Sequence, residues 1–336
     1  MENKHNPVTL ERLRELKNFE QLDGVTSVIK KVSHKETRQN KVYTELTLLG
    51  KNCEYEAKMW ETGKFTNILD EYVNKSVVVE INLKRKDHEG QYGLTAELVK
   101  MREDLDTSEE AYGTQRLLDK TKFNVELYVS WIQDEGIRRV CQKFIETYEG
   151  LIKTHPAGAK VHHDFIGGWE EHTVEVISGG LSLMRSDIST YPHKYTDKQV
   201  DRFICMALFH DAGKMYEMDA NGEYTLWGKA VGHTHLSTVM FNTALVEAGV
   251  TLNNEDYLII LNGILSHHGE IEWGAVKEPI SLEANLLHLM DMHSLHLSKF
   301  IGYSINPPMN SKDNIIRDFS RRRDYFIDSE MEKWRD

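Results

Sequence analysis

The sequence predicts two folded parts, an N-terminal five-stranded β-barrel and a C-terminal domain built of α-helices. Over residues 23–106, short runs that alternate apolar and polar residues and are rich in β-branched side chains indicate strands. Beyond residue 106 this alternation disappears and apolar residues recur at helical spacing. A length of 336 residues is enough for two domains of ordinary size. We therefore expect a multidomain protein of mixed α and β class.

Five strands are expected in the first part, with one helix among them. The helix is expected at Phe65–Val73, whose apolar residues fall on one helical face. Five strands with a helix between the third and the fourth is the order of an OB-fold barrel. The strands are expected at Val25–Val32, Val42–Leu49, Tyr55–Trp60, Val77–Leu83 and Tyr92–Val99.

The chain is expected to divide into five segments. They are an N-terminal helical arm (1–22), the OB-fold (23–106), a helical connector (107–159), an all-α domain (160–327) and a C-terminal tail (328–336). Within the connector helices are expected at Thr107–Leu118 and at Val125–Gly150. Capping and breaking residues predict helix starts at Asp197, Asn253 and Ser281, and helix ends at Gly179-Gly180, Gly249, Gly269 and Pro307-Pro308.

Composition limits the class of protein. No run approaches the roughly 20 apolar residues of a membrane helix, and the N-terminus lacks the apolar run of a secretory signal, so we expect a cytoplasmic protein. The three distant cysteines, Cys53, Cys141 and Cys205, are expected to be buried thiols. A formal net charge of −12 argues against binding nucleic acid by bulk attraction, but allows local basic patches.

Two loops of the predicted barrel carry cations and lie near aromatic residues. Such residues would hold a single strand by contacts to its phosphates and by stacking on its bases. Charged loops are also commonly only solvated, and barrel aromatics commonly belong to the core, so both interpretations apply. The candidate contacts are Arg38, Lys84, Arg85, Lys86, Tyr43 and Tyr92.

Histidines gather in the helical part, where 13 of the 16 lie between His155 and His296. A purely structural helical domain has no reason to accumulate them, so we expect a metal site. His210 and Asp211 end an apolar helix, where one metal ion can take the imidazole and the carboxylate while the second carboxylate oxygen reaches another ion. Lys214, one turn after His210, would place an ammonium beside a bound phosphate.

A lone His-Asp pair is common by chance, so the surrounding residues give this motif its weight. Each of them lies at or near a helix end or on an amphipathic helix, and the apolar faces of these helices must pack together. The competing interpretation for each is a hydrogen-bonded core histidine or a helix-capping aspartate. The residues are His172, in the run Gly-Gly-Trp-Glu-Glu-His-Thr, and then His233, His267, His268 and Asp291.

The order His, His-Asp, His, His-His, Asp resembles the two-metal form of the HD phosphohydrolase superfamily. Mixed imidazole and carboxylate ligands suit manganese, iron, cobalt or nickel, and the resemblance favours manganese or cobalt. It also implies a phosphate contact from Lys214. The implied ligands are His172, His210, Asp211 and Asp291 for a first ion, and Asp211, His233, His267 and His268 for a second.

A closer resemblance is to the YhaM family of 3′→5′ exoribonucleases. It rests on an OB-fold followed by this domain and on the motifs His162-His163, Gly-Gly-Trp-Glu-Glu-His-Thr, His-Asp-Ala-Gly-Lys, Gly-His and Ser-His-His-Gly. It covers roughly Asp23 to Phe326. It implies a hydrolase that degrades single-stranded RNA, and it places His162 and His163 near the mouth of the active site as substrate contacts. The sequence leaves open whether single-stranded DNA is a substrate as well. The 3′→5′ polarity comes only from this resemblance.

Two divalent ions would activate a water and stabilise the attacking and leaving oxygens, so no protein nucleophile is needed. Two other functions stay open. One is an HD-domain phosphodiesterase for cyclic nucleotides or mononucleotides, with the barrel as a regulatory module. The other is a non-catalytic single-strand binding protein. The sequence also leaves open whether the chain forms a homo-oligomer.

Overall fold

The computed structural model describes residues 6–37, 40–51, 53–60, 78–88, 92–105, 112, 124–158, 163–165, 167–186, 195–219, 222–305, 315–318 and 323–327. The chain divides into two compact units, Met1–Leu117 with Phe300–Asp336, and Leu118–Lys299. The second unit therefore begins before residue 160 and ends before residue 327, the limits expected for the all-α domain. Among the described residues, no helix is long and apolar enough to cross a membrane.

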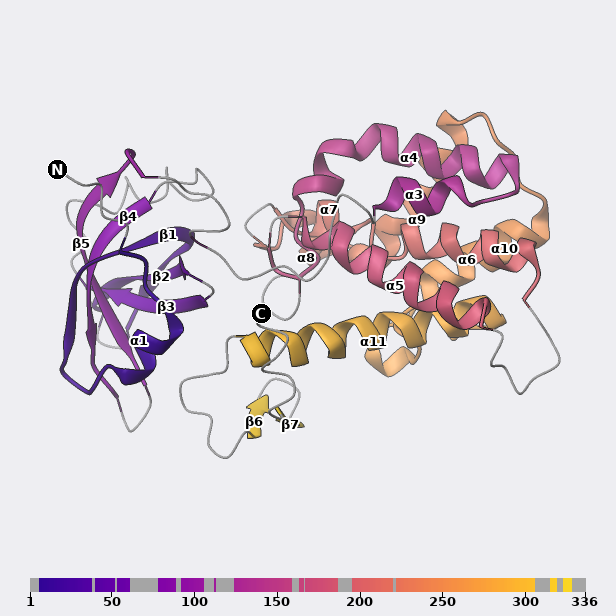
Figure 1. Ribbon diagram of the computed structural model, residues 1–336. Coiled ribbons are helices and arrows are strands. Elements are labelled where there is room, and N and C mark those ends of the chain that lie inside the picture. Colours follow the sequence, from indigo (N-terminus) through magenta and orange to yellow (C-terminus); the bar gives the residue numbers. More distant parts are fainter. Residues whose placement is uncertain are drawn as a thin grey trace. The chain divides into compact units, whose positions relative to one another are not determined.

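The first unit holds a closed five-stranded barrel with the strand order β1-β2-β3-β5-β4 (Figure 1). β1 pairs antiparallel with both β2 and β4, and β3 meets β5 in parallel. The five predicted strands are thus confirmed, whereas the predicted helix Phe65–Val73 lies outside the described residues. The strands are β1 (Gln21–Glu36), β2 (Val42–Gly50), β3 (Cys53–Met59), β4 (Val78–Arg85) and β5 (Leu94–Arg102).

The apolar side chains of the alternating pattern fill the inside of this barrel. In β2 and β3 every second side chain is buried, among them Leu46, Leu48 and Ala57. The short helix α1 (Leu10–Glu15) is capped by the hydroxyl of Thr9, the residue before it. Its Leu13 side chain belongs to the same core. The three cysteines are buried and free, as predicted.

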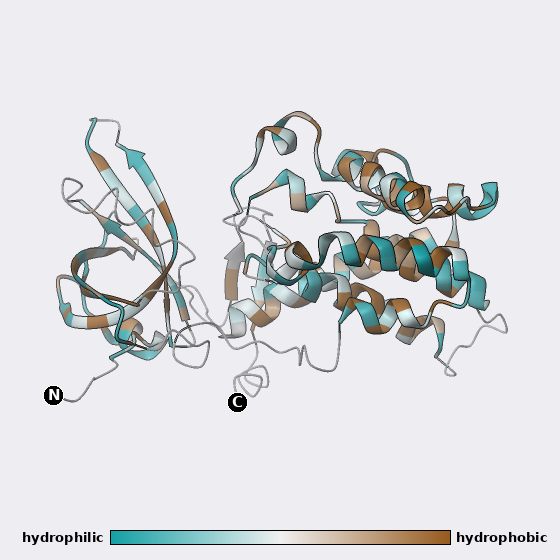
Figure 2. Cartoon of the chain, turned by 90° about the horizontal axis from the view of Figure 1, so that it is seen from above, coloured by the Kyte–Doolittle hydropathy of each residue, from teal (hydrophilic) through white to brown (hydrophobic). Residues whose placement is uncertain are grey.

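The second unit is a group of packed helices with large aromatic side chains at its centre. Phe144, Trp169, Phe203, Phe209 and Phe241 are fully buried there. Figure 2 shows hydrophobic and hydrophilic residues on different sides of these helices, as expected where one face is buried. The helices are α3 (Val125–Ser130), α4 (Glu135–Thr154), α5 (Gly168–Met184), α6 (Asp197–Phe209), α7 (Lys214–Glu217), α8 (Leu226–Ala230), α9 (His233–Glu247), α10 (Asn254–Ser266), η1 (Ile271–Trp273) and α11 (Leu282–Ile305).

Two predicted helix boundaries in the second unit are wrong. Val125–Gly150 is two helices, because the Asp134 side chain accepts from the Ile137 N–H and caps α4. α5 does not end at Gly179-Gly180. A Cβ at Gly180 would lie 2.1 Å from the Phe203 ring, so this glycine lets α5 approach α6 closely.

Other boundaries are close to their predictions. Asn253 caps α10, and the Ser281 hydroxyl accepts from the Ala284 N–H at the start of α11. The cap of α6 is Thr196 rather than Asp197, because Thr196 completes a capping box with Gln199.

The part after residue 300 is not all helical, contrary to the prediction. β6 (Ile315–Asp318) and β7 (Arg323–Phe326) form a two-stranded antiparallel sheet. Ile316 and Tyr325 are buried against Phe300 and Tyr303 near the end of α11. These strands are too short for their alternation to stand out in the sequence. The predicted tail 328–336 lies outside the described residues.

Candidate metal centre

The turn after α6 holds Asp211 at the centre of the helical unit. The Trp169 indole N–H donates to the Asp211 carbonyl oxygen over 2.8 Å. The Ser237 hydroxyl accepts from the Gly213 N–H at 2.8 Å and donates to the His210 carbonyl at 2.9 Å. A Cβ at Gly213 would lie 2.1 Å from the His233 carbonyl oxygen, so glycine allows α9 to reach this turn. α5, α6 and α9 together fix the position of the Asp211 carboxylate.

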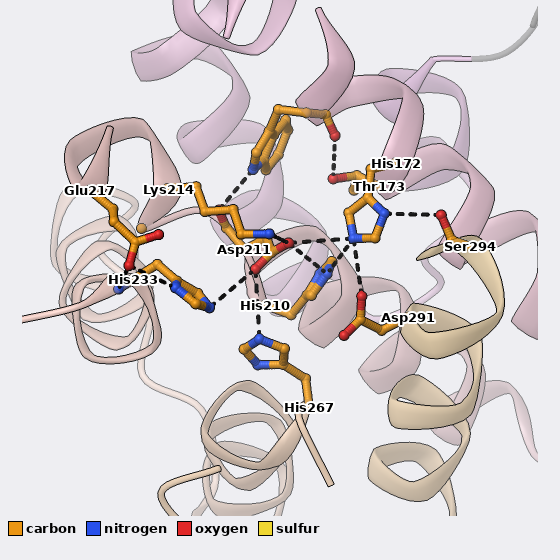
Figure 3. Close-up of polar contacts among 12 residues, drawn as sticks. His172, Thr173, His210, Asp211, Lys214, Glu217, His233, His267, Asp291 and Ser294 are labelled. Atoms are coloured by element: carbon orange, nitrogen blue, oxygen red, sulfur yellow. Dashed lines mark hydrogen bonds and ion pairs between the residues drawn. The ribbon is translucent and has the colours of Figure 1, made fainter. Parts of the chain in front are cut away.

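One oxygen of Asp211 faces a first group of ligands (Figure 3). Its Oδ2 lies 3.4 Å from Nε2 of His172 on α5 and 3.4 Å from Nε2 of His210 at the end of α6. Nε2 of His172 also lies 3.3 Å from Oδ1 of Asp291 on α11. The four residues offer ligand atoms that lie within 4.8 Å of one another, and we call them the first cluster.

The other oxygen of Asp211 faces a second group. Its Oδ1 lies 3.5 Å from Nε2 of His233 at the start of α9 and 3.6 Å from Nε2 of His267 at the end of α10. Nε2 of His268 lies 3.2 Å from Nε2 of His233. His233, His267 and His268, the second cluster, also offer ligand atoms within 4.8 Å of one another.

The outer nitrogens of three imidazoles show where their lone pairs point. Each Nδ1 lies against an oxygen that accepts hydrogen bonds, so each Nδ1 carries the hydrogen. The opposite Nε2 atoms therefore direct lone pairs towards Asp211. The outer contacts are His210 with the Ala207 carbonyl (2.7 Å), His267 with the Ile264 carbonyl (2.7 Å) and His233 with Oε1 of Glu217 (3.0 Å).

These donors fit a divalent cation better than they fit one another. Oδ1 of Asp211 and Nε2 of His267 are buried and, among the described residues, have no hydrogen-bond partner. Both are electron-pair donors, so their approach to 3.6 Å is unfavourable without a positive charge between them. Imidazole nitrogens combined with carboxylate oxygens are a ligand set for transition-metal ions.

Burial disfavours the charged form of every titratable side chain in the site, and the interactions with neighbouring groups decide which side chains stay charged. Burial would raise the pKa of Asp211, but the Lys214 ammonium holds it well below its usual range. The pKa of Asp291 is lowered in the same way, against burial, by its hydrogen bond to His172. Burial lowers the pKa of His267 well below its usual value. Burial would also lower the pKa of His172, yet hydrogen bonds to Asp211 and Asp291 raise it to about 9.

Lys214 supplies the ammonium of this site. It begins α7, and its Nζ lies 2.6 Å from Oδ2 of Asp211. Burial would lower the pKa of Lys214, but attraction to Asp211 raises it, so the side chain is a cation. The Lys214 side chain is 14% exposed.

The barrel residues predicted to touch a single strand are in different situations. Lys84 and Lys86 are exposed. Arg85 is engaged within the protein, donating to Asp87 and to the Leu16 carbonyl oxygen. Tyr43 is half-buried, with its ring 5.1 Å from that of the exposed Trp60. Tyr92 is half-buried and donates to the Leu13 carbonyl, whereas Arg38 lies outside the described residues.

The predicted pair of substrate-contacting histidines is described at one position, because His162 lies outside the described residues. His163 is 3% exposed, and its Nε2 lies 3.2 Å from Oε2 of Glu175. This places its Nε2 towards the protein interior rather than at a surface. Its role as a substrate contact stays a prediction.

Several residues that support the ligands carried no signal of their own in the sequence. Trp169 and Glu175 flank His172 on α5, but their contacts with Asp211 and with Ser294 cross between helices. Glu217 accepts from both the backbone N–H and the imidazole of His233. Only the packing of the helices brings these side chains to the ligands.

A comparison with known protein families identifies the kind of domain to which the residues of this site match. A family model described as HD domain matches residues 169–294, which include every residue of both clusters. The matched segment lies within the second unit and spans both clusters.

Curated relatives match most of the chain, and the resemblance to the YhaM family is confirmed. It is 27% identical over 279 residues to a protein named 3′-5′ exoribonuclease YhaM from Oceanobacillus iheyensis, covering 81% of this chain and 83% of that protein. It is 29% identical to a protein of the same name from Shouchella clausii, covering 81% and 82%. No solved structure matches the chain.

Proposed function

We propose that this chain is a metal-dependent hydrolase that degrades single-stranded RNA from its 3′ end. The observation that carries the proposal is the Asp211 carboxylate, which turns Oδ2 towards His172 and His210 and Oδ1 towards His233 and His267. A carboxylate placed in this way suits a bridging ligand between two ions. The reaction and its polarity are inferred from the relatives named 3′-5′ exoribonuclease.

Two divalent ions are the proposed cofactors. Bound here, they would activate a water and stabilise the attacking and leaving oxygens of the phosphodiester. Manganese or cobalt suits the mixed ligands, and iron and nickel share the same chemistry. The first ion is assigned to His172, His210, Asp211 and Asp291, and the second to Asp211, His233, His267 and His268.

The remaining residues of the site would hold ligands and substrate in place. The Lys214 ammonium is carried on a flexible stem, so it can turn from Asp211 to a phosphate oxygen and neutralise its charge. Trp169 holds the Asp211 backbone, and Glu217 orients His233.

We further propose that the barrel is an OB-fold that binds the single strand. The strand order of the closed barrel supports this assignment. The exposed ends of Lys84 and Lys86 provide phosphate contacts, and Trp60 beside Tyr43 provides a stacking surface. Stacking and phosphate contacts do not require a 2′-hydroxyl, so single-stranded DNA is expected to bind as well.

The test is a cleavage assay on metal-free protein resupplied with single divalent ions. Single-stranded RNA and DNA labelled at the 5′ end are the substrates. Removal of nucleotides from the 3′ end gives a descending ladder that keeps the label, whereas removal from the 5′ end releases a labelled mononucleotide at once. We expect the ladder on RNA with manganese or cobalt.

Other results of this assay favour the rival functions. Cleavage of a small chromogenic diester with no attack on RNA indicates a phosphodiesterase for small substrates. RNA binding with no cleavage under any ion indicates a non-catalytic binder. Equal RNA cleavage with and without a chelator contradicts the proposed metal dependence.

A further inference from the structure

A series of hydrogen bonds begins at the side of the His172 ring that faces away from the first cluster. Nδ1 of His172 lies 3.0 Å from the Ser294 hydroxyl oxygen (Figure 3). That hydroxyl donates to Oε2 of Glu175 over 2.6 Å. Nε2 of His163 lies 3.2 Å from the same carboxylate oxygen. Ser294, in the middle of this series of hydrogen bonds, is 1% exposed and therefore shielded from water.

The chemistry of the groups determines which one donates in each of these hydrogen bonds. Burial would raise the pKa of Glu175, but its hydrogen bond to His163 lowers it, so the side chain is a carboxylate that only accepts. Ser294 has one hydroxyl hydrogen, which it gives to Glu175. Its oxygen therefore accepts from Nδ1 of His172, and Nε2 of a neutral His172 keeps its lone pair.

We propose that Ser294 and Glu175 are positioning residues that fix the ring orientation and tautomer of His172, so that its Nε2 presents a lone pair to a metal ion. The inference rests on the proposed metal-dependent function and goes beyond its ligand set. A carboxylate behind the hydroxyl also makes the imidazole a stronger ligand, because it stabilises positive charge on the ring.

The source of the hydrogen-bond partner distinguishes His172 from His210 and His267. His210 and His267 each use a carbonyl oxygen three residues earlier in their own chain segment. His172 uses a hydroxyl from α11, the helix that also carries Asp291 one turn before Ser294. The contact therefore orients His172 and also sets the position of α11 that brings Asp291 to 3.3 Å from it.

His163 is the last residue in this series of hydrogen bonds, beyond Glu175. It has a φ of +48°, a left-handed conformation that a non-glycine residue rarely adopts unless its surroundings impose it. Its carbonyl oxygen accepts from the Ala157 N–H at 2.9 Å. A Cβ at Gly168 would lie 2.1 Å from that oxygen, so glycine is needed beside it. The backbone thus holds His163 towards Glu175.

The same residues suggest one competing assignment. His163, Glu171 and Glu175 offer ligand atoms within 4.8 Å of one another and could hold a separate cation. Oε2 of Glu175 is already engaged by both Ser294 and His163, which favours the positioning role.

The experiment titrates Co²⁺ into the metal-free full-length protein. Visible absorption reports the coordination of the ion, and elemental analysis counts the ions bound. We expect Ser294→Ala to weaken the binding of one ion by about 10- to 100-fold and to change its absorption bands. Ser294→Thr keeps the hydroxyl and should restore both. Glu175→Gln loses the charge behind the hydroxyl and should weaken binding to a smaller extent.

A matched control is Ser178→Ala, which removes a hydroxyl on α5 that bonds the Glu175 backbone carbonyl instead. It should bind Co²⁺ like the parent. Equal affinity and equal absorption bands in Ser294→Ala and the parent would overturn the proposal. Loss of one whole ion in Glu175→Gln, with parental affinity for the rest, would overturn it in favour of a separate cation site.

The two levels of the proposal fail in different ways. A parent protein that binds no Co²⁺ overturns the metal-dependent function together with this inference. A parent that binds two ions, with Ser294→Ala binding them equally well, overturns only the positioning role. Glu175→Gln is measured in the same titration and keeps the test decisive if Ser294→Ala does not fold.

Discussion

Oδ2 of Asp211 receives the Lys214 ammonium at 2.6 Å, on the same oxygen that faces His172 and His210. The Lys214 ammonium and two imidazoles of the first cluster therefore meet at one carboxylate oxygen. The proposed function predicts different effects for the loss of the Asp211 carboxylate and the loss of the Lys214 ammonium. Loss of the carboxylate removes the binding of ions, whereas loss of the ammonium removes a contact to substrate.

Asp211→Asn is expected to lose both ions and to lower RNA hydrolysis by at least about 10³-fold, because an amide neither bridges cations nor carries their counter-charge. Elemental analysis and the end-labelled RNA assay measure the two losses. Asp219→Asn, at an exposed aspartate, is the control and should match the parent. Hydrolysis by Asp211→Asn at the parental rate would contradict the bridging role.

Lys214→Ala is expected to keep both ions and to lower kcat by about 10²- to 10³-fold, since a positioned charge on the reacting phosphate is lost. Ion counting and steady-state kinetics on RNA distinguish this from a ligand role. Lys229→Ala removes an exposed lysine on α8 and should leave kcat unchanged. Loss of an ion in Lys214→Ala would show that the lysine supports the cluster itself.

Lys84→Ala combined with Lys86→Ala is expected to weaken RNA binding without slowing cleavage of a small diester. Removing two phosphate contacts should reduce the slope of log affinity against log salt by about 1.4. Fluorescence anisotropy over a salt series measures this slope. Lys143→Ala with Lys153→Ala, on α4, is the charge-matched control. Equal losses on RNA and on the small diester would argue against a binding role for the barrel.

The pH dependence of metal binding should follow His172, whose pKa is raised to about 9. A raised pKa stabilises the metal-free fold fully below the unfolded value of about 6.5, and this contribution is lost as pH rises towards 9. Metal ions displace the same proton, so Co²⁺ affinity should increase over this interval. Melting curves and Co²⁺ titrations between pH 6.5 and 9 test both trends. Metal affinity that does not change over this range would contradict the assignment of His172 as a ligand.

A buried ion-pair network away from the metal centre offers a stability test. Arg202 on α6 donates to Asp256 at 2.6 Å and lies 3.5 Å from Glu283, and all three are buried. Arg202→Ala removes the guanidinium from two buried carboxylates, of which Asp256 keeps the Lys198 ammonium at 3.1 Å, and should lower the free energy of unfolding by about 3 kcal/mol. Chemical denaturation measures the change. Arg139→Ala, which loses an exposed contact to the Ala248 carbonyl, is the control.

The same network predicts an acid limit to stability. Burial would raise the pKa of Asp256, but its hydrogen bond to Arg202 lowers it. A lowered pKa contributes stability above the unfolded value of about 3.9, and the contribution is lost as pH falls through the folded value. The difference in stability between the parent and Arg202→Ala should therefore narrow below about pH 4. A constant difference down to pH 2 would contradict this account.

The sequence by itself determined the five strands, most of the helices and the residue types of the site. Strand alternation and helical spacing are local properties, so Leu46 and Leu48 could be placed inside a barrel without any tertiary information. The pairing of His210 with Asp211 is local in the same sense. Their adjacency at the end of an apolar helix decides that both reach the interior.

Only the tertiary structure decided which atoms face one another. The division of the two Asp211 oxygens between His172 and His233 depends on how α5, α6 and α9 pack, and no spacing along the chain encodes those angles. The contact of Ser294 with His172 joins residues 122 positions apart. The physical reason is that spacing fixes which side of a helix a residue occupies, whereas the packed core fixes what lies opposite it.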